Sequence, residues 1–197
     1  MSVIVQGRLL DIPLVGLYPV GIGDANRCLV EWGHRLGPVF RPFRQEAYGF
    51  EVDGALVAVA ISGSIVHGPV AAAWKDRDGW HVPFEDRPEG YARNEVVELT
   101  RLAAAESWMS RIMLRLWREV CAPRWKSWPV RAAVSYSHNA MHRGDLYRFD
   151  GWEKVREDAG SSGGGTWSRK RKNTDAVFGK KTLWMWRYAI TQEEERK

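Results

Sequence analysis

One stretch, residues 94–120, constrains the fold of this 197-residue chain more than any other. Its first part, residues 96–102, is short, apolar and rich in β-branched side chains, which predicts a strand inside a sheet. From Ser107 onward, apolar side chains recur every three or four residues with arginines between them, which predicts an amphipathic helix. The recurring apolar positions are Met109, Ile112, Met113, Leu116, Trp117 and Val120.

The turn between this strand and this helix, residues 103–107, is built mostly from small side chains and offers Ser107 as an N-cap. The first N–H groups of a helix have no partner within the helix, and the helix dipole favours negative charge there. The turn therefore predicts a site for an anion such as a phosphate. The same pattern is typical of a strand-turn-helix unit that only packs a core, and the stretch alone leaves both interpretations open.

The other segments predict a mixed α/β sheet. Residues 96–102 and 130–135 are expected strands joined by the helix, so we expect them to be parallel, with a right-handed crossover. Asp53-Gly54 predicts a tight turn between strands at 48–52 and 55–62. Further expected elements are strands at 3–10, 152–156 and 181–190, a helix at 25–35 capped by Asp24, and a short helix at 140–149.

The whole chain, residues 1–197, is expected to form a single domain, because its apolar content of 45% is enough for one substantial core. Residues 63–93 are irregular and predict an insertion or lid, and residues 157–180 predict a flexible basic loop rich in glycine and serine. No run of 18 apolar residues and no leader pattern occurs, so we expect a cytoplasmic protein with no membrane partner. Cys28 and Cys121 lack metal-ligand spacing and predict neither a disulfide nor a metal site.

Positive charge is concentrated near the C-terminal end of the sequence. The formal net charge of the chain is +5, whereas residues 166–187 alone hold seven Lys or Arg and one Asp, a net of +6. A segregated basic segment indicates a polyanionic partner such as double-stranded DNA, although a charge run also occurs in ordinary solvated loops. The candidate nucleic-acid-binding residues, an aromatic side chain for stacking and four cations for phosphates, are Trp167, Arg169, Lys170, Arg171 and Lys172.

Arg101 is the first candidate for a functional side chain. A buried arginine on a central strand is costly unless it meets a carboxylate or a phosphate. Glu98 lies three residues earlier and faces the other side of an extended strand, so it is not the natural partner. An ion pair of Arg101 with Glu106 or Asp145 and a functional role toward a ligand remain equal alternatives.

Polar side chains also gather after the strand at 130–135, where open α/β sheets place their ligands. Tyr136, His138 and His142 lie there, and His138 is a candidate general base because imidazole titrates near neutral pH. His138 and His142 could begin a metal site, but no third ligand follows at suitable spacing. His34, at the expected end of the first helix, could be a ligand or a base, but the favoured interpretation is a histidine stabilised by the C-terminal dipole. Trp108 and Trp117 are expected in the core or in pocket walls.

The order of elements and two local patterns resemble the GNAT acyltransferase superfamily. The patterns are the strand-turn-helix at residues 96–120 and the segment from Tyr136-Ser137-His138-Asn139 to Tyr147 and Gly151-Trp152. The resemblance implies a GNAT-like fold, a donor such as acetyl-CoA or a related acyl donor, and Tyr147 as proton donor to a leaving thiolate or as a positioning hydroxyl. Tyr147 could equally be a core tyrosine. The implied cofactor-binding residues are Leu102, Ala103, Ala105, Glu106, Ser107, Trp108 and Asn139.

Within that superfamily, four short motifs resemble the Mom-type DNA-modification proteins of phages. They are Glu98-Leu99-Thr100-Arg101-Leu102, Glu106-Ser107, Ser135-Tyr136 and the segment from His142 through Gly144 to Tyr147. The resemblance implies transfer to the exocyclic amine of a flipped-out adenine in DNA, as protection against restriction, with Arg101, Tyr147, His138 and Tyr136 as catalytic residues. The alternatives are an acetyl-CoA-dependent N-acetyltransferase acting on a small amine or a protein, and a non-catalytic nucleic-acid-binding protein on the same scaffold. A homodimer is left open.

Overall fold

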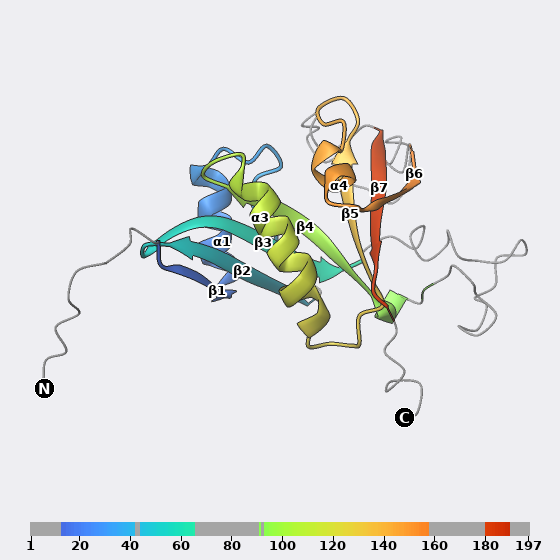
Figure 1. Cartoon of the computed structure of the whole chain (residues 1–197), viewed down its shortest axis with the longest axis horizontal. Coiled ribbons are helices and arrows are strands. Elements are labelled where there is room, and N and C mark those ends of the chain that lie inside the picture. The colour runs from blue at the N-terminus through green and yellow to red at the C-terminus, as the bar shows by residue number, and fades with distance from the viewer. Residues whose placement is uncertain (1–12, 42–43, 66–90, 92, 158–179, 190–197) are drawn as a thin grey trace, which may run out of the picture.

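The computed structural model describes residues 13–41, 44–65, 91, 93–157 and 180–189. Their strands form one mixed sheet in the order β1-β2-β3-β4-β5-β7-β6, with α3 lying across one face (Figure 1). The strands are β1 Val15–Val20, β2 Gln45–Val52, β3 Ala55–Ser64, β4 Val96–Ala104, β5 Ala132–His138, β6 Glu153–Arg156 and β7 Lys181–Arg187. The helices are α1 Ile22–Glu31, α3 Met109–Leu116 and α4 Asp145–Phe149, and short helical turns cover Arg93–Glu95, Trp117–Cys121 and Ala122–Arg124.

The predicted hairpin is confirmed, and its turn has the conformation that the sequence implied. β2 and β3 pair antiparallel around Asp53 and Gly54, whose φ values of 50° and 83° are both positive. Two consecutive positive φ values give the turn a twist that matches the twist of the flanking strands. The strands extend beyond the predicted limits, since β2 begins at Gln45 and β3 continues through Gly63 and Ser64, which the sequence had placed in the insertion.

The central crossover is also confirmed, because β4 and β5 are parallel and are connected through α3. Their pairing is short. Val96 to Leu99 pair with Ala132 to Ser135, and β4 then continues for five residues beside β3 alone. Beyond Leu99 the two strands diverge, as Figure 1 shows for β4 and the β5-β7-β6 group.

Alternate side chains of β3 enter two different cores, which shows that helices cover both faces of the sheet. Ala58 and Ala60 belong to the larger core, which contains Met113 and Leu114 of α3 and Trp117 of the helical turn that follows; we call residues 109–121 the α3 segment. Val59 and Ile61 belong to a second core with Ala25 and Leu29 of α1. We refer to these two sides as the α3 face and the α1 face.

Several predicted boundaries were wrong for local reasons. The first helix covers Ile22–Glu31 with Gly21 as N-cap, so Asp24 lies inside the first turn. It ends before Gly37 because Gly33 adopts a φ of 62°, a left-handed conformation that terminates helices. Ser107 is not the N-cap of α3; Trp108 is, without a side-chain cap, since tight turns over residues 106–110 precede the helix. The helix expected at 140–149 is confined to Asp145–Phe149.

One described strand, β1 Val15–Val20, was missed, and some expectations lie outside the described residues. Gly16 and Pro19 weaken the strand pattern of β1, which pairs only with β2 at the edge of the sheet. The strand expected at 3–10, most of the 63–93 insertion and most of the 157–180 loop are not described. No helix within the described segments is long and apolar enough to span a membrane.

Candidate functional site

The divergence of β4 and β5 opens a cavity of about 990 Å³. Its walls come from both strands, from the connection after α1, from residues 140–147 and from the start of β7 at Lys181. The lining includes five Lys or Arg (Arg35, Arg41, Arg101, Arg143 and Lys181), two carboxylates (Glu98 and Asp145) and three histidines (His34, His138 and His142). This cavity brings together the four residues predicted to be catalytic: Arg101, Tyr136, His138 and Tyr147.

An irregularity in β4 decides on which side of the sheet Arg101 lies. Ile61 pairs with Arg101 whereas Ser62 pairs with Leu99, so Thr100 is an extra residue in the ladder. The Thr100 hydroxyl donates to the carbonyl oxygen of Ile61 at 2.8 Å. Because Leu99 enters the core of the α3 face, this bulge turns Arg101 toward the α1 face, the side that Ala103 also faces.

Tyr147 lies on the α3 face of the cavity and is held by aromatic contacts. Its ring stacks on Trp184, with centroids 5.8 Å apart, and meets Trp152 edge-on at 5.4 Å. Its hydroxyl oxygen lies 2.8 Å from the hydroxyl oxygen of Ser135, which donates to the carbonyl oxygen of Leu99 at 3.0 Å. Burial raises the pKa of Tyr147 above its usual value, so the hydroxyl stays protonated at neutral pH. Ser135 was predicted only as part of a motif; its inward direction on β5 was the available signal.

Gly144 allows α4 to approach β7 closely enough for these contacts. Its φ is 73°, and a Cβ atom built there would lie 2.2 Å from a ring carbon of Trp184. Any larger residue would therefore displace the tryptophan on which Tyr147 stacks. The turn also starts α4, because the carbonyl oxygen of Gly144 accepts the backbone N–H of Tyr147.

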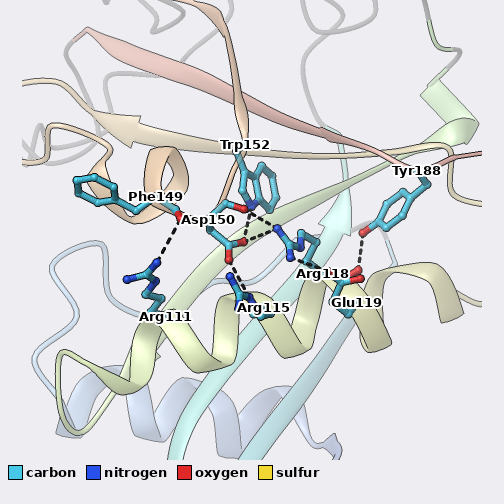
Figure 2. Close-up of polar contacts among 8 residues, drawn as sticks. All are labelled: Arg111, Arg115, Arg118, Glu119, Phe149, Asp150, Trp152 and Tyr188. Atoms are coloured by element: carbon cyan, nitrogen blue, oxygen red, sulfur yellow. Dashed lines mark hydrogen bonds and ion pairs between the residues drawn. The ribbon is translucent and has the colours of Figure 1, made fainter.

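A buried ion-pair network fixes the end of α4 against the α3 segment (Figure 2). Asp150, whose side chain is fully buried, contacts Arg118 at 2.8 Å and Arg115 at 3.3 Å. One carboxylate oxygen of Asp150 also accepts the indole N–H of Trp152 at 3.1 Å. The Arg118 guanidinium in turn lies 3.7 Å from the ring centroid of Trp186. These contacts hold α4, and with it Tyr147, at a defined position beside the cavity.

The α1 face of the cavity contains a buried pair of opposite charges. Arg41 donates to both carboxylate oxygens of Glu98, at 2.7 and 3.0 Å, and to the carbonyl oxygen of Ser64. Arg101 lies beside this pair and donates to the carbonyl oxygens of Gly37 and Thr100. The predicted ion pair of Arg101 with Glu106 or Asp145 does not form; Asp145 pairs with Arg148. Burial lowers the pKa of Arg101 to about 10, so it remains charged at neutral pH.

His34 lies in the wall of the cavity, which differs from its predicted environment. Burial, with smaller contributions from Arg101 and His142, lowers the pKa of His34 to about 4. The imidazole is therefore neutral at pH 7, whereas a histidine stabilised by a helix dipole would have a raised pKa. The interpretation as a dipole-stabilised histidine was wrong, because α1 ends three residues earlier and burial, the largest cause, disfavours the charged imidazole.

Three polar residues of the strand end, Tyr136, His138 and His142, line the same cavity, and Asn139 follows His138 in the chain. His138 is the last residue of β5, and His142 follows in the next turn, where its backbone N–H donates to the carbonyl oxygen of His138. The side-chain oxygen of Asn139 accepts the hydroxyl of Thr182 at 2.8 Å. Burial raises the pKa of Tyr136. Within the described segments, no group of three His, Cys, Asp or Glu side chains could hold a metal ion.

The residues predicted to bind the donor have different environments. Leu102 lines the cavity, as does Ser110 in the first turn of α3, whereas Ala103 is buried in the α1-face core. The backbone N–H of Ala105 already donates to the carbonyl oxygen of Val57 at 2.9 Å. Glu106, Ser107 and Trp108 are exposed at the turn before α3. Trp108 is 60% exposed, so its expected place in the core or a pocket wall was wrong.

The predicted nucleic-acid contacts cannot be placed, because Trp167, Arg169, Lys170, Arg171 and Lys172 lie outside the described residues. Arg35 and Arg143, both exposed, add positive charge at the cavity.

Neither the protein-family models nor the curated protein sequences give a match to this chain. Solved structures do. The chain is similar to the ribosomal-protein-S18-alanine N-acetyltransferase of Escherichia coli, with a TM-score of 0.54 and 10% identity over 91% of this chain and 97% of that one. The chain has the GNAT acyltransferase fold. This confirms the predicted mixed α/β fold.

Two further structures share the GNAT fold at similar distance. One is an IAA acetyltransferase from Bacillus cereus, with a TM-score of 0.52 and 12% identity over 89% of this chain and all of that one. The other is an N-acyl amino acid synthase from uncultured soil microbes, with a TM-score of 0.53 and 9% identity over 89% of this chain and 92% of that one. At these identities the likeness concerns the GNAT fold, and the activity has to be argued from the site.

Proposed function

We propose that this protein is an acyltransferase that moves an acyl group from a coenzyme A thioester to an amine. The observation that supports this most is the cavity between the diverging strands, which joins a protonated tyrosine on the α3 face to a cationic wall on the α1 face. A thioester that enters from one face and an amine that enters from the other would meet between β4 and β5. The acyltransferases that share the fold support the same conclusion.

In the proposed reaction the amine nitrogen attacks the thioester carbonyl carbon, a C–N bond forms, and the C–S bond breaks with its electron pair on sulfur. Tyr147 donates its hydroxyl proton to the leaving thiolate, and the proton lost by the amine passes to His138. The Tyr147 hydroxyl is protonated at neutral pH, so it has a proton to donate as the thiolate forms. Ser135 holds the tyrosine hydroxyl in place until then.

The donor would lie along the free edge of β4 and at the start of α3. Beyond Leu99, no strand among the described residues pairs with β4 on the side of β5, so the backbone groups on that edge suit a ligand. The backbone N–H groups of Glu106, Ser107 and Trp108, three exposed residues at the helix start, suit the phosphates of coenzyme A. Leu102 and Ala103 would contact the donor through their backbone. Asn139, next to the cavity-lining His138 at the end of β5, would complete its binding.

For the acceptor we propose the exocyclic amine of adenine in DNA, as in Mom-type proteins. Five cations against two carboxylates in the cavity wall, and the net charge of +6 over residues 166–187, both favour a polyanionic substrate. A base that reacts must leave the duplex, and a cavity of about 990 Å³ has room for a flipped nucleotide. In this proposal Trp167 and the four cations from Arg169 to Lys172 would contact the DNA strand.

Two other candidates rest on specific observations. The E. coli structure is named for acetylation of a protein and the B. cereus structure for acetylation of a small molecule, which favours an ordinary N-acetyltransferase. The engaged N–H group of Ala105 weakens the turn as a phosphate site and favours a non-catalytic binder.

Nucleoside mass spectrometry tests the proposal. DNA is taken from cells that express the wild-type chain and from cells that express Arg101→Ala at equal level, and acetyl-CoA binding is measured by calorimetry on both proteins. A new nucleoside that disappears in the variant supports DNA modification, and its mass identifies the added group. Unmodified DNA together with acetyl-CoA binding would leave acyl transfer to another amine. Unmodified DNA without acetyl-CoA binding would contradict the proposal.

A further inference from the structure

The α1 face of the cavity holds more positive charge than its own carboxylate can balance. Arg41, Arg101 and Lys181 lie around a single acid, Glu98. Both oxygens of Glu98 are engaged by Arg41, whose side chain is 16% exposed against 10% for Glu98. The charge of Glu98 is therefore balanced by Arg41, and the other two cations have no carboxylate of their own on this face.

Arg101 and Lys181 are those two cations, and they come from different parts of the sheet. Arg101 extends from β4 and has no carboxylate within ion-pairing distance among the described residues. The Lys181 side chain, at the start of β7, forms no hydrogen bond or ion pair with any residue in the described ranges. Both side chains line the same cavity, and the charge of Arg101, after burial, is among the causes that lower the pKa of Lys181. Two partly buried like charges are unfavourable unless an anion joins them.

The donors that remain on these side chains point to the kind of anion. Arg101 uses its Nε–H and one Nη1–H on carbonyl oxygens, so three of its five N–H groups are left, and Lys181 keeps all three. A carboxylate carries one charge, which either cation alone could balance. A phosphate monoester carries up to two charges and three free oxygens, and two neighbouring phosphodiesters of a DNA strand carry one charge each, so either matches a guanidinium and an ammonium together.

We propose that Arg101 and Lys181 form a binding site for a phosphate group carried by the acceptor substrate, on the α1 face of the cavity. This deepens the proposed function, because it adds an anionic group next to the amine that receives the acyl group. The Arg41–Glu98 pair supports the site from behind and keeps Glu98 from neutralising it. The phosphate would thus anchor the acceptor on one face while the donor is held on the other.

The test measures dissociation constants by NMR titration for inorganic phosphate, deoxyadenosine monophosphate and deoxyadenosine. Each titration is run with and without saturating acetyl-CoA, so that phosphate sites of the donor are distinguished from the acceptor site. We expect wild-type protein to bind inorganic phosphate in both conditions and to prefer the nucleotide to the nucleoside. Lys181→Met should weaken phosphate binding about tenfold or more and abolish that preference, because a charge-assisted hydrogen bond is lost.

Three comparisons exclude a loss of folding. Lys181→Arg keeps the charge and should bind phosphate within a few-fold of wild type. Lys154→Met removes an exposed lysine of β6 and should leave binding unchanged. In the free protein Lys181→Met removes a like charge beside Arg101, so its melting temperature should be equal to or above that of wild type. A misfolded variant would instead lose both affinity and stability.

Unchanged phosphate affinity in Lys181→Met, or absence of phosphate binding in wild type, would overturn the inference. Its failure is separate from failure of the proposed function. Acetyl-CoA binding without the phosphate site would refute the anion site alone, whereas a phosphate site without acetyl-CoA binding would refute acyl transfer and leave the anion site standing.

Discussion

The hydroxyl oxygens of Tyr147 and Ser135 lie 2.8 Å apart, and the proton between them belongs to Tyr147. Ser135 has a single hydroxyl proton, which it donates to the carbonyl oxygen of Leu99 at 3.0 Å. Leu99 and Ser135 are also the last pair in the ladder between β4 and β5. The tyrosine hydroxyl is thus tied to the point where the two strands separate, which makes it sensitive to whatever enters there.

Tyr147→Phe should lower acyl-transfer turnover about 100-fold, because the proton donor to the leaving thiolate is removed. The ring contacts with Trp152 and Trp184 persist, so the free energy of unfolding should fall by only about 1 kcal/mol, the contribution of one hydrogen bond. Steady-state kinetics with a saturating acceptor and urea denaturation provide the two numbers. Ser135→Ala is the matched control for the hydrogen bond, and equal turnover in wild type and Tyr147→Phe would exclude the tyrosine as proton donor.

Asp150→Asn should lower the free energy of unfolding by about 3 kcal/mol, because it leaves the buried Arg118 guanidinium without its buried partner. Turnover should fall as well, since α4 carries Tyr147. Asp145→Asn is the control for stability. Its pair with Arg148 is about half exposed, so that change should be below about 0.5 kcal/mol. Chemical denaturation measures the free energy of unfolding of both variants. Similar losses of stability in the two would contradict the role given to Asp150.

Glu98→Leu should destabilise the fold by about 3 kcal/mol, because Arg41 then stays buried beside Arg101 and Lys181 without a carboxylate. The double variant Arg41→Met/Glu98→Leu should regain most of that loss, since a buried ion pair replaced by apolar groups is often near neutral. A double-mutant cycle by urea denaturation measures the coupling between the two residues. Additive effects would show that the pair is not energetically coupled.

Acidification should lower the free energy of unfolding through His34, which is neutral in the folded chain at pH 7. Its pKa is about 4 in the folded chain against about 6.5 when unfolded, so protons favour the unfolded state. The stabilisation is present above pH 6.5 and is lost as the pH falls toward 4, by roughly 2–3 kcal/mol in total. Carboxylates add their own acid dependence, so the quantity to measure is the difference between wild type and His34→Gln. That difference should shrink across pH 6.5 to 4, and a constant difference would mean that His34 titrates normally.

Replacing Arg169, Lys170, Arg171 and Lys172 by glutamine should weaken DNA binding and flatten its dependence on salt. Each lost phosphate contact reduces the slope of log K against log salt concentration by about 0.9. Fluorescence anisotropy with a short duplex from low to moderate salt measures the slope. Replacing the exposed Lys126 and Lys154 by glutamine is the control for a general change in net charge. An unchanged slope in the four-residue variant would remove this segment from DNA binding.

The sequence predicted those parts of the fold that local patterns specify. The apolar, β-branched run of residues 96–102, the helical spacing from Met109 to Val120 and the Asp53-Gly54 turn depend on neighbours in the chain. The structure confirms the parallel crossover and the hairpin. The sequence also predicted that Tyr136, His138 and His142 gather, because open α/β sheets place their ligands at strand ends, and all three line the cavity together with Arg101 and Tyr147.

Contacts between distant segments were not predictable in the same way. The partner of Glu98 is Arg41, 57 positions away, and nothing in the local pattern links them. The bulge at Thr100 changes which face Arg101 occupies, yet one extra residue in a ladder leaves no signal in a single sequence. The exposure of Trp108 was also not predictable, because a helical pattern gives the periodicity of a helix but not the burial of the residues at its start.

The short ladder between β4 and β5 also gives the sheet a graded stiffness. At its closed end, four residue pairs must break before the strands can move apart. Past Leu99, among the described strands, β4 pairs with β3 and β5 pairs with β7 on their outer sides, and no ladder pairs join β4 to β5 across the gap. The width of the opening can therefore adapt to the thickness of what enters, while the Leu99–Ser135 pair sets how deeply it can go.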